Sequence, residues 1–115
     1  MMNWKSIRLE LGQTREFPSG SVSRAYLVRL PLDDDDRIDA SAFDRAPDRA
    51  TVRRHWSAEP DQRGQIVRDG HSWHLRCNGE TQSLDFDSRP IRLGEQVSIV
   101  GHDGSALPFR IASIR

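Results

Sequence analysis

The chain has 115 residues, of which 17 are basic and 17 are acidic, so its formal net charge is zero. This length fits one β-rich domain over residues 1–115 with a single core. Zero net charge argues against a general polyanion binder, which would carry a basic field. Every basic residue except Lys5 is arginine. This composition has two interpretations: the guanidinium groups bind anions, or they simply pair with nearby aspartates.

Cysteine content and hydropathy indicate the cellular compartment in which the protein works. The single cysteine, Cys77, excludes an intramolecular disulfide framework and fits a reducing environment. Residues 1–11 carry charges and no continuous apolar run, so we expect no signal peptide. The longest apolar stretch, residues 97–100, is too short to cross a bilayer. We therefore expect a small, soluble, bacterial-type cytoplasmic protein with no membrane partner.

The N-terminal third predicts two strands. Ile7, Leu9 and Leu11 alternate with polar residues, as in a half-buried strand. Residues 24–30 predict a second strand. Pro31 lacks an amide hydrogen, so we expect it to end that strand or to place it at an edge.

An acidic run follows at residues 33–36, where four aspartates repel one another and must be solvated or bind a cation. The run resembles part of an EF-hand loop. It has Asp36 where that loop needs glycine and Ala42 where it needs the bidentate glutamate. We therefore expect a solvated acidic loop and assign no metal ligand here.

Between the acidic run and the middle of the chain we expect one short helix and then a strand. Asp39 can cap a helix within residues 39–46, and Phe43 would anchor that helix to the sheet. Residues 50–56 read as a strand or a helix, and the β-branched pair near their start favours the strand. Residues 57–64 are expected to form a surface loop.

Residues 65–86 predict a three-stranded antiparallel meander. Asp69-Gly70 and Asn78-Gly79 are residue pairs that tolerate the positive φ of tight hairpin turns. Two-residue loops at these dipeptides place Ile66 opposite Trp73 and Trp73 opposite Leu84, all on one buried face. The same face would carry Leu75, Cys77 and Phe86.

The C-terminal region predicts strands at residues 96–100 and 109–114, joined by a turn at 102–105. Together the elements number about seven or eight short strands. The fold class is therefore mainly β: a small antiparallel β-barrel, or alternatively a sandwich, with one short helix. Closure into a barrel is attractive because it removes exposed sheet edges.

Catalytic and metal-binding patterns are weak. His71, His74 and Cys77 are good zinc ligands by type, but His74 points to the opposite face of its strand from Cys77, so we assign no metal site. No serine lies in a strand–elbow–helix context and no glycine-rich phosphate loop is present. We expect no cofactor, and we lean against an enzyme.

The clearest candidate site is a basic and aromatic cluster of Arg49, Arg53, Arg54 and Trp56. We expect a non-catalytic binding or interaction module that engages a protein partner or an anionic ligand there. Trp4 or exposed sheet edges offer routes to a homodimer.

Two alternatives stay open. The first is a single-stranded nucleic-acid binder, with phosphates on the arginines and a base stacked on Trp56. The hairpin over residues 94–114 resembles OB-like barrels in general architecture, and that resemblance implies such binding. The second alternative is a small-ligand barrel or an enzyme, with His74 or His102 as the titrating group.

Overall fold

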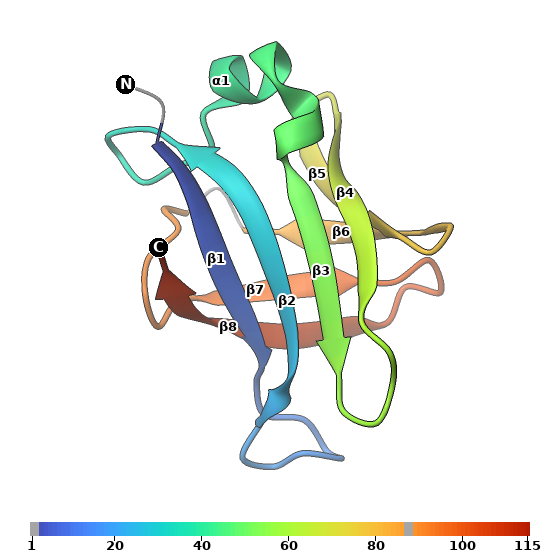
Figure 1. Cartoon of the computed structure of the whole chain (residues 1–115). Helices are drawn as coiled ribbons and strands as arrows, with labels where there is room; N and C mark the ends of the chain where they lie inside the picture. The colour runs from blue at the N-terminus through green and yellow to red at the C-terminus, as the bar shows by residue number, and fades with distance from the viewer. Residues whose placement is uncertain (1–2, 87–88) are drawn as a thin grey trace.

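The computed structural model describes residues 3–86 and 89–115, and these form a closed antiparallel barrel of eight strands in sequence order (Figure 1). The strands are β1 (Asn3–Leu11), β2 (Ser21–Leu32), β3 (Thr51–Trp56), β4 (Gln62–Asp69), β5 (Ser72–Cys77), β6 (Glu80–Asp85), β7 (Gln96–Val100) and β8 (Ala106–Ile114). Strand β8 pairs with both β7 and β1, which closes the sheet. The predicted β-barrel is confirmed, and the sandwich alternative is wrong. The eight-stranded meander also differs from the five-stranded OB architecture.

The core fills the barrel because alternate residues of each strand point inward. In β1, Ile7 and Leu9 are fully buried and Leu11 is nearly so, which confirms the predicted alternation. On the neighbouring strand β8, Phe109 lies opposite Leu11 and is 1% exposed. Its ring meets the Tyr26 ring edge-on at a centroid distance of 5.4 Å.

Strand β2 is longer than predicted. β2 continues one residue past Pro31 to Leu32, and Pro31 pairs with Trp4 of β1 but lies beyond the residues of β2 that pair with β3, so the expectation that Pro31 lies at an edge is confirmed. The Pro31 carbonyl accepts a hydrogen bond from the Asp39 amide. The backbone at Pro31 therefore faces the segment before the helix rather than a neighbouring strand, so its missing amide costs no ladder bond.

A short helix, α1 (Ala40–Arg45), lies at one end of the barrel and is followed by a 3-10 turn, η1 (Pro47–Arg49) (Figure 1). The predicted helix and its cap are confirmed: the Asp39 carboxylate accepts a hydrogen bond from the Ala42 amide at 3.0 Å. Phe43 is 5% exposed and its ring meets Trp73 edge-on, with centroids 4.9 Å apart. No helix in the described parts of the chain has the length and apolarity that spanning a bilayer requires.

Replacing the cap residue tests how far this helix depends on local chemistry. We expect Asp39→Ala to destabilise the protein by about 1 kcal/mol, because one helical amide loses its acceptor. Asp34→Ala, in the exposed run beside it, should change stability by less than about 0.5 kcal/mol. Urea unfolding followed by circular dichroism measures both variants, and equal effects would contradict the capping role of Asp39.

The meander is confirmed, but one of its two turns is displaced. The second turn is Asn78-Gly79 as predicted, with positive φ at both residues and Trp73 opposite Leu84. The first turn was placed wrongly at Asp69-Gly70: Asp69 stays in β4, and Gly70 and His71 form the loop. Only the first loop residue, Gly70, has positive φ, which is sufficient for a type II′ turn.

The displaced turn moves the register of β4 and β5 by two residues. Ile66 therefore lies opposite Leu75 instead of Trp73, and both Ile66 and Leu75 are 1% exposed. A shift of two keeps every side chain on its predicted face. Trp73 does point inward, but it is half-buried because it lies near the barrel rim against α1.

The structure decides between strand and helix for residues 50–56 in the middle of the chain. Residues Thr51–Trp56 form a strand, as favoured, and not a helix. The predicted loop over 57–64 is too long, because β4 begins at Gln62 and pairs with Arg54. A pairing of this kind depends on the neighbouring strand and has no signal in the local sequence.

Neither predicted route to a homodimer is offered by this barrel. Closure through β1 and β8 joins the two end strands to each other. The Trp4 ring is 9% exposed and lies beneath the Arg49 guanidinium, 4.6 Å from it. A dimer therefore stays a prediction that requires another surface.

Candidate functional site

The structure separates the four residues of the predicted cluster into three locations. Arg54 and Trp56 lie together on the inner side of β3, with the guanidinium 4.3 Å from the ring centroid. Arg53 directly precedes Arg54 in β3 and therefore points outward, where it is exposed. Arg49 lies in η1 against Trp4. The four residues do not form one surface.

The inner pair belongs to a packed aromatic and polar cluster near the end of the barrel away from α1. The Tyr26 hydroxyl donates across the barrel from β2 to the Gln82 side-chain oxygen on β6, at 3.0 Å. Trp56 packs against Tyr26 and Phe109, at centroid distances of 6.3 and 6.4 Å. Arg54 also reaches Glu59 at 3.3 Å. Because the Trp56 ring already contacts three side chains, it is poorly placed to stack a nucleic-acid base.

The inner cluster contains no activated nucleophile. Burial raises the pKa of the Cys77 thiol, and the nearby Arg54 only partly opposes that shift. Burial likewise raises the pKa of the Tyr26 hydroxyl, again against Arg54. Both groups are therefore protonated at neutral pH, and Cys77 packs as a small core residue, in agreement with its predicted structural role.

The four histidines lie at different places on the barrel. His74 lies 3.3 Å from the Ser83 hydroxyl on the outer surface, and His55 lies 2.8 Å from the Asp61 carboxylate. His71 is exposed in the first turn of the meander, and His102 is exposed between β7 and β8. Within residues 3–86 and 89–115, no three histidine, cysteine or acidic side chains come together as metal ligands.

The acidic run at residues 33–36 forms a turn that its own side chains close. The Asp33 carboxylate accepts hydrogen bonds from the amides of Asp35 and Arg37, at 2.8 and 3.1 Å. Asp36 pairs with Arg92 at 3.2 Å. These contacts give Asp33 and Asp36 structural roles in the loop.

A group of outward-pointing arginines on β2 to β5 is the most distinctive surface. Arg53 of β3 lies directly opposite Arg63 of β4. Arg29 of β2 and Arg76 of β5 flank this pair on the two outer strands. We call Arg29, Arg53, Arg63 and Arg76 the arginine face.

Polar side chains occupy the middle of the arginine face. Thr51 lies opposite Gln65, and Gln65 lies opposite Arg76. On the other flank, Arg29 donates to the Ser6 hydroxyl at 3.2 Å. A hollow of about 450 Å³ lies over this surface. Its lining includes Ser6, Arg29, Thr51, Arg53, Arg63 and Gln65.

Acidic residues leave most of the arginine face uncompensated. Asp61 approaches Arg53 only to 3.9 Å and is also bonded to His55. In the described parts of the chain, no carboxylate lies within ion-pair distance of the other three arginines of the face. The face therefore carries local positive charge although the whole chain is neutral.

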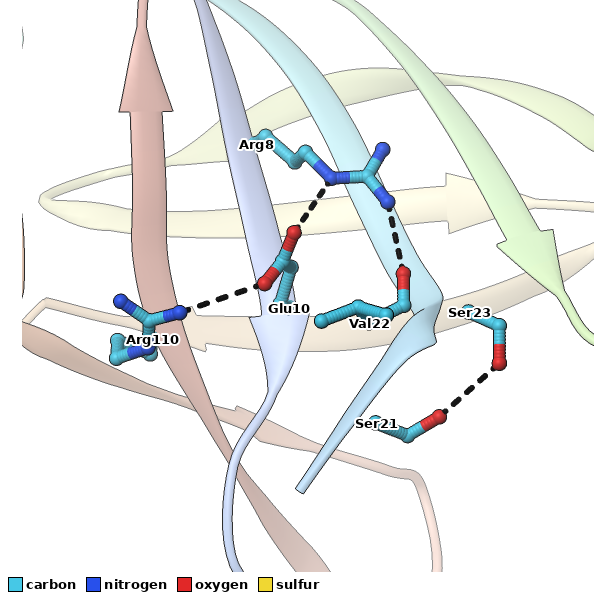
Figure 2. A network of polar contacts seen from close by, with 6 residues as sticks. All are labelled: Arg8, Glu10, Ser21, Val22, Ser23 and Arg110. Atoms are coloured by element: carbon cyan, nitrogen blue, oxygen red, sulfur yellow. Dashed lines mark hydrogen bonds and ion pairs between the residues drawn. The ribbon is translucent and has the colours of Figure 1, made fainter. Parts of the chain in front are cut away.

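Other surface arginines show the contrast. Figure 2 shows Glu10 between Arg8 and Arg110, at 2.8 and 3.4 Å, on the neighbouring strands β1 and β8. Arg68 is likewise held by Asp44 at 2.7 Å. Pairing with nearby acids, the simplest expectation for this composition, therefore accounts for Arg8, Arg68 and Arg110 but not for Arg29, Arg63 and Arg76 of the face.

A larger hollow of about 940 Å³ lies around the meander and the segment after β6, on the α1 side of the barrel. Trp73, Leu84 and Ile91 supply apolar wall, and Arg37 and His71 contribute polar groups. The small-ligand alternative would use this hollow. Neither His74 nor His102, the two titrating groups predicted for that alternative, lines it.

Sequence reasoning found Arg53 but missed Arg29, Arg63 and Arg76. Arg63 was assigned to a loop, so its position opposite Arg53 had no signal in the sequence. Comparison with protein-family models, curated proteins and solved structures finds no match for this chain.

Proposed function

We propose that this protein is a non-catalytic binding module that holds an anionic ligand, or an anionic group of a partner, on the arginine face. The observation that carries the proposal is the direct opposition of Arg53 and Arg63, where the one carboxylate in reach, Asp61, lies 3.9 Å from Arg53 and is shared with His55. Like charges at directly opposed positions of a sheet are destabilising. An anion bound between the two guanidinium groups would relieve this repulsion.

The chemistry of the surrounding side chains supports the same proposal. Guanidinium groups bind carboxylates and phosphates through paired N–H donors. Thr51 and Gln65 add a hydroxyl and an amide donor between the arginines. A hollow of about 450 Å³ over the face leaves room for a compact anion.

A double variant tests the proposal with inorganic pyrophosphate as the probe. We expect the wild-type protein to bind pyrophosphate at low ionic strength, measured by calorimetry, and Arg53→Gln/Arg63→Gln to weaken binding by at least about tenfold, since hydrogen bonds to charged groups each contribute about 1.5–3 kcal/mol. The same variant should be as stable as the wild type or slightly more stable, because the opposed charges are gone.

Two controls separate the face from charge in general. Arg15→Gln/Arg45→Gln removes the same net charge from exposed positions elsewhere and should leave binding unchanged. Arg54→Gln, on the inner side of β3, should also leave it unchanged. Equal loss of binding in the control double variant, or no binding by the wild type, would refute the proposal.

A further inference from the structure

A row of polar side chains crosses the barrel surface at right angles to the strands. The pairings Ser6 with Arg29, Thr51 with Gln65, and Gln65 with Arg76 place these residues at one level. Arg29 follows Val28, which pairs with Val52, so Arg29 lies beside Thr51. The complete row, from β1 to β6, is Ser6, Arg29, Thr51, Gln65, Arg76 and Thr81.

Every member of this row can donate a hydrogen bond, and none carries a negative charge. Arg53 and Arg63 lie two residues along their strands from Thr51 and Gln65, so they widen the middle of the row. Neighbouring strands are about 4.8 Å apart, so the row extends about 24 Å along the curved surface. A compact anion would use only its middle.

We propose that the row binds an extended polyanion, the sugar–phosphate backbone of a single-stranded nucleic acid, lying across β1 to β6. This inference rests on the proposed function and names its ligand class. Regularly spaced phosphates match a row of donors, and neutralising them with arginine supplies the affinity. Because the chain as a whole has no net charge, we expect the nucleic acid to bind along the row and not over the rest of the surface.

The shape of the surface favours a single strand over a duplex. The outside of a closed barrel is convex, and a flexible strand can bend around it. A stiff duplex would touch it over only part of the row, since its persistence length is about 150 base pairs. The row contains no aromatic side chain, and Trp56 lies inside the barrel, so binding should not depend on base identity.

Fluorescence anisotropy with a labelled twelve-nucleotide poly-dT strand tests the inference. If about four phosphates are neutralised, affinity should fall about 50-fold between about 50 and about 200 mM salt. Arg29→Gln/Arg76→Gln removes the outer arginines and should reduce that fall to about sevenfold. A poly-dA strand of equal length should bind as tightly as poly-dT, and a duplex of equal length should bind more weakly.

The possible results separate this inference from the proposed function. If pyrophosphate binds through Arg53 and Arg63 but poly-dT does not bind, the ligand is a compact anion and the inference is wrong. The same holds if the outer-arginine variant keeps the full salt dependence, or if poly-dA and poly-dT differ strongly in affinity. If neither probe binds, the proposed function fails as well.

Discussion

Gly64→Ala should destabilise the protein by at least about 3 kcal/mol, at the upper end of what overpacking costs. A Cβ atom at this position of β4 would lie 1.9 Å from the Arg76 carbonyl oxygen and 2.7 Å from the Cys77 sulfur. The sulfur can move with its side chain, but the carbonyl belongs to the backbone of β5. The two strands would therefore have to separate, and their ladder would be disrupted.

Gly12→Ala is the matched control, because a Cβ there meets its nearest atom at an ordinary 3.4 Å. Chemical unfolding of both variants should show a large loss for Gly64→Ala and less than about 1 kcal/mol for Gly12→Ala. A small effect at Gly64 would show that β4 and β5 do not approach as closely as this structure has them.

Phe109→Ala should cost about 3–5 kcal/mol, the range for truncating a buried phenylalanine. Phe109 is 1% exposed and its ring contacts both Tyr26 and Trp56. These two rings come from β2 and β3, whereas Phe109 comes from β8, so the aromatic cluster joins opposite ends of the chain. Truncation would leave a cavity at this junction.

Leu107→Ala on the same strand provides the control. Leu107 is 40% exposed, so its truncation should change the free energy of unfolding by less than about 0.5–1 kcal/mol. The near-ultraviolet circular dichroism of Phe109→Ala should also weaken, because Trp56 and Tyr26 lose their common packing partner. An unchanged spectrum with full stability would contradict the burial of Phe109.

The elements that sequence reasoning predicted correctly depend on nearest neighbours. Alternation at Ile7, Leu9 and Leu11 predicts a strand because every second side chain shares a face. Asn78-Gly79 predicts its turn because both residues accept positive φ. Asp39 predicts the start of α1 because a carboxylate bonds an amide three residues on.

The first turn of the meander shows where local reasoning stops. Asp69-Gly70 is an acceptable type I′ loop if both residues take positive φ, and Gly70-His71 is an acceptable type II′ loop if Gly70 alone does, which is what the structure has. Both pairings leave Ile66 on the inner face, so local patterning does not choose between them, and the packed barrel sets Ile66 against Leu75. Trp73, which the sequence places on the buried face, still points inward but is only half-buried, because it lies near the barrel rim against α1.

The candidate site likewise combines residues that the sequence identified with a residue that only the strand pairing brings beside them. Arg53 and Trp56 were identified from composition, but the alternation of β3 sends them to opposite sides of the sheet. The residue that completes the face, Arg63, lies opposite Arg53 only because β3 and β4 pair in this register.

By itself, the sequence determined the approximate positions of the strands, the Asn78-Gly79 turn, the helix cap and the mainly β class of this protein. Each of these follows from backbone sterics and side-chain alternation within a few residues. Only the tertiary structure decided the closure of the barrel through β1 and β8, the register of β4 against β5, and the gathering of Arg29, Arg53, Arg63 and Arg76 on one face. These depend on which strands become neighbours and at what level, and that choice is set by the packing of the whole core.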